Sequence, residues 1–97
     1  MIIRVVRMTF QYEKVNEFLE IFDGSKEKIR ARNGCEHLEL LQDIHHENVY
    51  TTYSYWKSEA NLNEYRESEL FGTVWSATKA LFSDRPRAHS YQQKIKL

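Results

Sequence analysis

The sequence predicts an α+β domain with the ferredoxin-like order β-α-β-β-α-β, in which an antiparallel sheet carries its helices on one face. Three observations predict this class. The chain opens with a strand-like segment that is apolar on both faces, continues with apolar residues at helical spacing, and then has two strand-like segments joined by a short polar turn. We expect the 97 residues to form a single domain (1–97), since chains of this length commonly fold as one unit.

The first strand is expected over residues 2–10. Val6 and Met8 fall on one face of this strand and Ile3 and Val5 on the other, so both faces are partly apolar. A strand of this kind is usually central in its sheet, with other groups packed against each side.

After Tyr12 the apolar period changes to that of a helix. Four residues at i, i+3, i+4 and i+7 form one apolar face: Val15, Phe18, Leu19 and Phe22. We expect Asp23-Gly24-Ser25 to interrupt or kink this helix, with Ser25 capping a second helical piece that runs to Arg32. Gly34 then supplies the positive φ of a C-terminal cap.

Two further strands are expected over residues 35–43 and 49–56, and the short polar turn between them predicts an antiparallel hairpin. Alternation divides the first of these strands into two faces, one with Leu38 and Leu40 and the other with Cys35, His37 and Leu41. The second strand contains four aromatic residues, Tyr50, Tyr53, Tyr55 and Trp56. Because a buried tyrosine hydroxyl needs a partner, this strand is expected to be covered on both faces or to line a pocket for a flat organic molecule.

Two capped helices and an edge strand complete the predicted order. Ser58 is expected to cap a short helix that ends near Arg66, and Ser68 to cap a longer helix over residues 69–82. The segment that follows contains Pro86, which stops the helix. Residues 88–97 alternate as a last strand that is polar enough to lie at the edge of the sheet.

Composition excludes several classes of function. Lys and Arg number 14 and Asp and Glu number 14, so the chain has no net positive field that would attract nucleic acid or an anionic membrane. The single Cys35 cannot form an intramolecular disulfide or a thiolate metal site. No apolar run is long enough for a membrane span or a signal peptide, and we therefore expect a cytoplasmic protein.

The sheet is expected to bury both of its faces. Helices cover only one face of a ferredoxin-like sheet, yet the first and third strands are apolar or aromatic on both. We therefore expect the open face to pack against a second copy of the chain, giving a homodimeric α/β barrel.

Several motifs in this order resemble the antibiotic biosynthesis monooxygenase family of small dimeric α+β barrels. They are Asn33-Gly34-Cys35 followed by His37-Leu38-Glu39-Leu40-Leu41, then Tyr53-x-x-Trp56-x-Ser58, Tyr65-Arg66-x-Ser68-x-x-Phe71, and Trp75-x-x-x-Lys79-x-Leu81-Phe82. No single motif is a catalytic signature, and it is their order and spacing that carry the resemblance to this fold. Similar domains have differing chemistry, so the function needs a separate argument.

The resemblance implies a cofactor-independent monooxygenase that oxidises a small aromatic, quinol-type substrate with O₂ and needs no metal or flavin. Such a site holds the substrate in an apolar pocket, removes a proton from it and excludes water. His37 and Tyr65 are the candidate catalytic residues, because an imidazole is well suited to accept a proton near neutral pH and a phenol can hydrogen-bond a phenolate. The candidate substrate-binding residues are Tyr53, Trp56, Arg66, Phe71 and Trp75.

Three alternatives remain open from the residues. His37 also fits a structural strand histidine, the large aromatic residues also fit a core, and Arg66 also fits a solvated helix charge or a dimer contact. A second function class is a non-catalytic small-molecule-binding or stress-response barrel. Haem binding or degradation is disfavoured, because the resemblance places Val6, Tyr65 and Trp75 where the haem-degrading branch has its asparagine, tryptophan and axial histidine.

His45-His46-Glu47 and Cys35 are not expected to carry chemistry. The three adjacent turn residues point in divergent directions and match no metal-binding spacing, so we expect them to be solvent-exposed. Cys35 enters a strand with no adjacent base to activate it, which is typical of a small buried thiol.

Overall fold

The computed structural model describes all 97 residues and shows one antiparallel sheet of four strands in the order β2-β3-β1-β4. The strands are β1 (Ile2–Thr9), β2 (Cys35–Gln42), β3 (Val49–Trp56) and β4 (Arg87–Gln92). β1 pairs with both β3 and β4, which confirms that it is a central strand. The predicted ferredoxin-like order β-α-β-β-α-β is confirmed.

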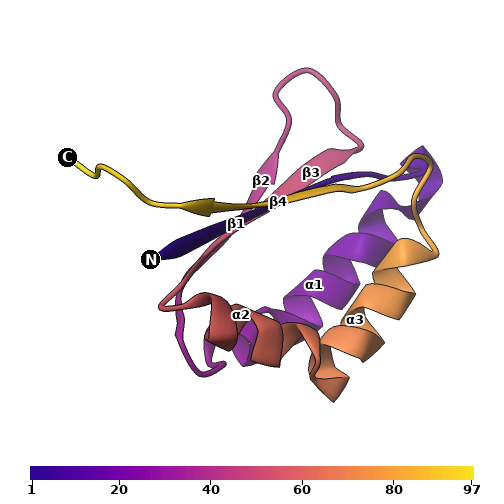
Figure 1. Cartoon of the computed structure of the whole chain (residues 1–97). Helices are drawn as coiled ribbons and strands as arrows, with labels where there is room; N and C mark the ends of the chain where they lie inside the picture. Colours follow the sequence, from indigo (N-terminus) through magenta and orange to yellow (C-terminus); the bar gives the residue numbers. More distant parts are fainter.

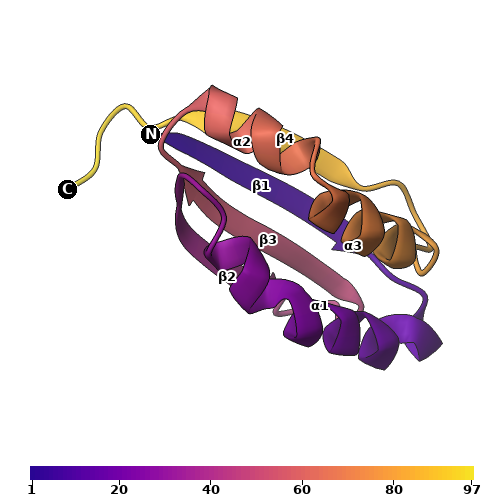
Figure 2. The same ribbon diagram turned by 90° about the horizontal axis from the view of Figure 1, so that it is seen from below.

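All of the helices lie on one face of this sheet (Figure 1). A short 3-10 turn (Tyr12–Lys14) leads into α1 (Val15–Arg30), and α2 (Glu59–Arg66) is followed directly by α3 (Glu69–Lys79). Figure 2 shows α1 along the β2–β3 side of the sheet and α3 along the β1–β4 side. The opposite face of the sheet carries no helix. None of the helices combines the length and the apolar character that crossing a bilayer requires.

The helix α1 is continuous, so the predicted interruption at Asp23-Gly24-Ser25 was wrong. The Ser25 hydroxyl donates a hydrogen bond to the Ile21 carbonyl oxygen (2.8 Å) instead of capping a new helix. A serine that bonds back to the preceding turn is compatible with a helix interior. The helix ends at Arg30 with Ala31 as its C-cap, and not at Arg32 as predicted, whereas the predicted positive φ of Gly34 is confirmed at 84°.

Two glycines are expected to respond to alanine in opposite directions. Gly24→Ala should raise the free energy of unfolding by about 0.5–1 kcal/mol, because it lies inside α1 and an added Cβ would meet nothing within 4 Å. Gly34→Ala should lower it by roughly 1–2 kcal/mol or more, since φ is positive there. An added Cβ at Gly34 would also lie 2.3 Å from Cγ of Asn61. Urea denaturation of both variants measures the two changes, and equal destabilisation by both would contradict this account.

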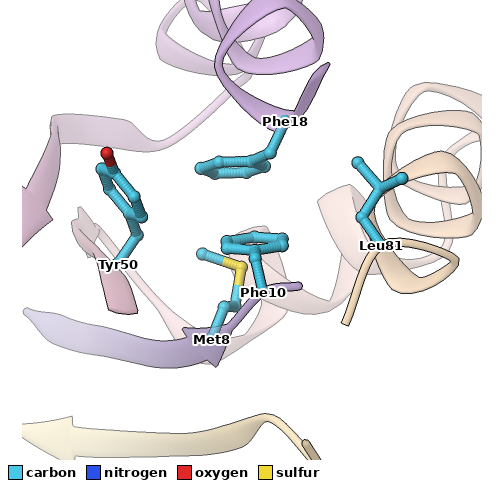
Figure 3. Close-up of a cluster of buried hydrophobic side chains, with 5 residues drawn as sticks. All are labelled: Met8, Phe10, Phe18, Tyr50 and Leu81. Atoms are coloured by element: carbon cyan, nitrogen blue, oxygen red, sulfur yellow. The ribbon is translucent and has the colours of Figure 1, made fainter. Parts of the chain in front are cut away.

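The main core lies between α1, the ends of β1 and β3, and the segment after α3 (Figure 3). Phe10 has no exposed surface, and its ring stacks on that of Phe18 at a centroid distance of 4.2 Å. Leu81 is buried in this cluster, and Phe82 forms an isolated bridge with Phe10. The helix α3 therefore ends at Lys79 and not at residue 82 as predicted, because Leu81 and Phe82 leave the helix to cover Phe10.

Two predicted strand features are also corrected. The last strand ends at Gln92 instead of residue 97, because its neighbour β1 begins at Ile2 and the final backbone bond joins the Gln93 N–H to the Met1 carbonyl oxygen (3.1 Å). In β2, Cys35 faces the helices and not the side of His37, because an irregularity of register separates the two residues. A bulge of this kind shifts the alternation by one residue.

The open face of the sheet carries an aromatic cluster formed by His37, Tyr53 and Tyr55. The ring centroids of His37 and Tyr55 lie 4.7 Å apart, and those of Tyr53 and Tyr55 lie 5.5 Å apart. Ile3 and Val5 of β1 pair with Tyr55 and Tyr53, so they share this face. The open face therefore combines apolar and aromatic side chains with the charged side chains of Arg7, Glu39 and Arg87, and no helix covers it.

Candidate functional site

A cavity of about 300 Å³ lies between the sheet and the helices, and 13 of its 18 lining residues are hydrophobic. Its floor consists of alternate residues of the two central strands, Arg4, Val6 and Met8 from β1 and Thr52, Ser54 and Trp56 from β3. These side chains share one face because successive residues of a strand point to opposite sides. The alternation of side chains along β1 and β3 therefore determines which of their residues line the cavity.

Four aromatic rings form a continuous wall of the cavity. Trp56 and Tyr65 stack at a centroid distance of 5.0 Å, Tyr65 meets Phe71 edge-on at 5.2 Å, and Phe71 stacks with Trp75 at 5.9 Å. These four residues line the cavity together with Arg66. The structure thus brings together five of the seven residues proposed from the sequence for catalysis or substrate binding.

Two serine caps position this wall. The Ser58 Oγ accepts a hydrogen bond from the backbone N–H of Asn61 (3.2 Å), and the Ser68 Oγ accepts one from the N–H of Phe71 (3.2 Å). Both caps agree with the sequence prediction, and each fixes the start of a helix. Because α3 begins within a few residues of the end of α2, Tyr65 and Phe71 come together at this junction.

The polar groups of the cavity are few. Ser54 is buried and its Oγ accepts a hydrogen bond from Nε1 of Trp56 (3.0 Å), which fixes the indole ring. Nη1 of Arg4 donates to the Ser90 Oγ (3.0 Å) across the β1–β4 pair. The titratable side chains that line the cavity are Arg4, Tyr65 and Arg66, and the lining includes no carboxylate or imidazole.

Tyr65 is a hydrogen-bond donor at neutral pH and not a base. Burial raises the pKa of Tyr65 to about 12, and the nearby Cys35 thiol acts in the same direction. The phenol therefore stays protonated over the whole physiological range. A ligand that loses a proton in this cavity must pass that proton to water, because no lining side chain is suited to accept it.

The buried phenol predicts a specific alkaline instability. A folded-state pKa near 12, above the usual pKa of about 10, means that the Tyr65 contribution is intact below pH 10 and is lost as the pH rises toward 12. Between pH 9 and pH 11, the wild type should lose about 1 kcal/mol more unfolding free energy than Tyr65→Phe. Urea denaturation at both pH values measures this, and parallel losses in the two proteins would contradict the assignment.

His37 and Tyr53 do not line the cavity. Both lie on the open face of the sheet, where His37 hydrogen-bonds with the Glu39 carboxylate through Nε2. Tyr53 lies between Thr52 and Ser54 on β3, whose side chains do line the cavity, so the pleat turns it to the opposite side. The two residues are therefore separated by the sheet from Tyr65 and Trp75.

Arg4 lines the cavity although the sequence analysis did not single it out. The sequence could have predicted this position, because Arg4, Val6 and Met8 are alternate residues of the first strand and therefore share one face. An arginine inside an apolar strand is unusual enough to be considered as part of a site.

Cys35 packs behind the cavity wall against Trp56 and Leu62 without lining the cavity itself, and the turn after β2 contributes no lining residue. Burial raises the pKa of the Cys35 thiol, whose Sγ lies 3.7 Å from the His37 carbonyl oxygen. His45 and His46 donate their backbone N–H groups to Oδ1 of Asp43 (2.8 and 3.0 Å), which shapes the turn. No group of three His, Cys, Asp or Glu side chains in the chain is close enough to hold a metal ion.

Comparison with protein families agrees with the fold. Residues 1–74 match the model of the family described as antibiotic biosynthesis monooxygenase. The chain belongs to this family. Within the antibiotic biosynthesis monooxygenase family, the matched region extends from β1 to Val74 in α3 and so includes most of the cavity lining.

Solved structures with the same fold cover nearly the whole chain. A conserved protein from Methanosarcina mazei Go1 superposes with a TM-score of 0.91 at 23% identity, covering 97% of this chain and 94% of that one. An antibiotic biosynthesis monooxygenase superposes with a TM-score of 0.91 at 16% identity, covering 98% and 100%. Rv0793 from Mycobacterium tuberculosis gives 0.91 at 14% identity, covering 98% and 96%. No curated protein matches the sequence.

The three positions that the resemblance compares with the haem-degrading branch lie in one place. Val6, Tyr65 and Trp75 all line the cavity. None of them is a histidine, the axial ligand that the haem-degrading branch carries on the long helix.

Proposed function

We propose that this member of the antibiotic biosynthesis monooxygenase family binds a small aromatic, quinol-type molecule in the cavity between sheet and helices and oxidises it with O₂ without a metal or organic cofactor. The observation that carries the proposal is the apolar cavity of about 300 Å³ with its wall of four aromatic rings. A cavity of this size and lining is typical of small-molecule sites. Family membership supports the reaction class.

The proposed reaction uses the chemistry of the substrate itself. A hydroxylated aromatic loses a proton to water, and the resulting anion transfers one electron to O₂. The substrate radical and superoxide then combine to a carbon-bound peroxide, which eliminates water and leaves a carbonyl group on the substrate. In sum, for an anthrone-like substrate a CH₂ group and O₂ give a C=O group and H₂O. A hydroquinone has no CH₂ group, and its loss of two electrons and two protons to O₂ gives a quinone and H₂O₂. The protein contributes a site from which bulk water is largely excluded and donors that stabilise the anion.

Each residue of the proposed site has a defined task. Trp56, Phe71 and Trp75 hold the flat body of the substrate by ring contacts. Tyr65 donates a hydrogen bond to the developing oxyanion, because its phenol is protonated at neutral pH. Arg66 supplies positive charge at the same end of the cavity.

Oxygen uptake tests the proposed function. Purified protein is incubated with a panel of hydroquinones and anthrone-like phenols, without added metal or flavin, and O₂ consumption and quinone formation are followed together. We expect acceleration over buffer for at least one substrate and its loss in Val74→Trp, which fills the cavity from α3. Ala77→Trp is the matched control, because Ala77 lies on the exposed side of the same helix and does not line the cavity.

One observation favours a second function, that of a binding protein without turnover. The cavity lining contains no carboxylate or imidazole, so the chain offers a ligand no general base. If ligands of the panel bind but none is oxidised faster than in buffer, the cavity serves binding alone.

The open face of the sheet supports the proposal of a homodimer. His37, Tyr53 and Tyr55 form an aromatic cluster there, with Ile3 and Val5 beside it. No helix covers this face, and Nζ of Lys96 from the C-terminal segment lies 5.9 Å from the centroid of the Tyr55 ring. A second copy placed face to face would bury these side chains and close the two sheets into a barrel.

The proposed dimer is expected to dissociate when a charge enters this face. Tyr53→Asp should shift the protein from dimer to monomer at micromolar concentration, because an unpaired carboxylate would be buried between the two sheets. Tyr12→Asp is the control, since Tyr12 is 67% exposed at the start of the helical layer. Sedimentation velocity measures the change, and a monomeric wild type at micromolar concentration would refute the dimer.

A further inference from the structure

Two guanidinium groups lie at one cavity that is otherwise mainly apolar. Arg4 comes from the middle of β1 and Arg66 from the last turn of α2, and both line the cavity. Neither belongs to the ion pairs of the chain, which join Arg7 with Asp43, Lys26 with Asp23, His37 with Glu39, and Lys57 with Glu36. The cavity therefore carries two positive charges that no carboxylate of the chain balances.

The surroundings of Arg4 make this charge unfavourable in the unliganded protein. Burial, followed by the positive charge of Arg66, lowers the pKa of Arg4, so the two guanidinium groups interact electrostatically. The one side-chain hydrogen bond of Arg4 joins its Nη1 to Ser90, although a guanidinium has five N–H donors. An anion between the two arginines would relieve their repulsion and use the remaining donors.

We propose that Arg4 and Arg66 bind the acidic group of the ligand, so that the cavity selects planar aromatic anions, carboxylates or phenolates, over neutral aromatics of the same shape. This inference rests on the proposed function in one respect, that the cavity is the substrate site. The aromatic wall of Trp56, Tyr65, Phe71 and Trp75 receives the flat body of the ligand, and the two arginines receive its charged end.

The arginine pair also explains how a cavity without a general base can bind a reactive anion. The charged and titratable side chains that line it are Arg4, Tyr65 and Arg66, and all three favour negative charge on a ligand oxygen. The two positive charges and the Tyr65 hydroxyl oppose the desolvation that disfavours the ionised form of a bound phenol, and the proton of that phenol passes to solvent.

A matched pair of ligands tests the selectivity. Binding of 2-naphthoate and of 2-naphthamide, a neutral compound of nearly the same shape, is measured by isothermal titration calorimetry. We expect 2-naphthoate to bind the wild type at least about tenfold more tightly, as expected for charge-assisted hydrogen bonds. This preference should fall to within about threefold in Arg4→Met and in Arg66→Met. Arg85→Met, a change at an exposed arginine outside the cavity, should retain it.

Further variants separate lost charge from lost structure. Arg4→Lys and Arg66→Lys keep the charge and should keep part of the preference, and thermal unfolding shows whether each variant is folded. Equal binding of the two ligands to the wild type, no binding of 2-naphthoate, or a preference unchanged in both methionine variants would each overturn the proposal.

The outcome is independent of turnover. If 2-naphthoate is selected by the arginines but no quinol is oxidised, the anion site stands and the proposed function fails. If quinols are oxidised in the cavity but the arginine variants select naphthoate as the wild type does, the proposed function stands and this inference fails.

Discussion

Replacing Phe10 by alanine is expected to lower the free energy of unfolding by about 3–5 kcal/mol, as for other fully buried aromatic residues. Phe10 has no exposed surface, stacks on Phe18 and lies within 6.2 Å, between ring centroids, of Tyr50. Its loss would leave a void that these neighbours, one from α1 and one from β3, cannot both close. Because small domains are stable by only about 5–15 kcal/mol in total, much of the variant would be unfolded in mild denaturant.

Urea denaturation at a fixed protein concentration measures this loss, since a dimer would make the apparent stability depend on concentration. Tyr12→Ala provides the control at a nearby aromatic that is 67% exposed, and its effect should stay within about 0.5 kcal/mol. Phe10→Leu should retain about half of the stability lost in the alanine variant, because leucine fills part of the void. A loss below about 1 kcal/mol for Phe10→Ala would show that the core can repack around position 10.

The order of the elements was predicted from local features of the sequence, such as cap residues and a glycine with positive φ, because each of these features favours one backbone conformation. Gly34 takes the positive φ expected after α1, and Ser58 and Ser68 cap the helices that follow them. In these cases the residue type determines the backbone conformation at its own position, or its side chain accepts a hydrogen bond from a nearby backbone N–H group. No distant contact is needed for such features to form.

The boundaries that sequence reasoning placed wrongly depend on tertiary partners. β4 stops at Gln92, where its pairing with β1 ends at Ile2, and the alternation of residues 88–97 cannot reveal this. α3 stops at Lys79 because Leu81 and Phe82 pack against Phe10, a residue more than 60 positions earlier in the chain. Periodicity alone identifies an element more reliably than its ends.

The candidate site also has residues that the sequence predicted correctly and residues whose position depends on tertiary structure. Trp56 and the residues of α2 and α3 were predicted together because each lies on the apolar side of its own element. Because side chains alternate along β3, Tyr53 lies on the open face of the sheet, opposite to Trp56. The register irregularity in β2 places Cys35 and His37 on different faces. The sequence motifs predicted which residue types belong to the site, whereas the alternation along β3 and the bulge in β2 determine which of these residues contact one another.

Tyr65→Phe is expected to slow the proposed oxidation, whereas His37→Ala is expected to leave its rate nearly unchanged. Removing the Tyr65 hydroxyl should lower kcat/KM at neutral pH by about 10-fold to 100-fold, the effect of losing a hydrogen bond to a charged group. His37→Ala should leave kcat/KM within about twofold, because the sheet separates His37 from the cavity. Oxygen uptake with the most reactive hydroquinone of the panel measures both changes.

The pH dependence of the same assay decides which group gives up the proton. With no base lining the cavity, the wild-type rate should rise with pH through one ionisation, that of the bound substrate, and then stay level until Tyr65 ionises near its pKa of about 12. Tyr65→Phe should shift the rise to higher pH, because the phenolate loses a donor, whereas His37→Ala should leave it in place. If His37→Ala removes an ionisation from the profile while sedimentation shows an unchanged assembly, catalysis involves the open face of the sheet. That result would contradict the assignment of the reaction to the cavity, since no path through the sheet connects the imidazole with the aromatic wall.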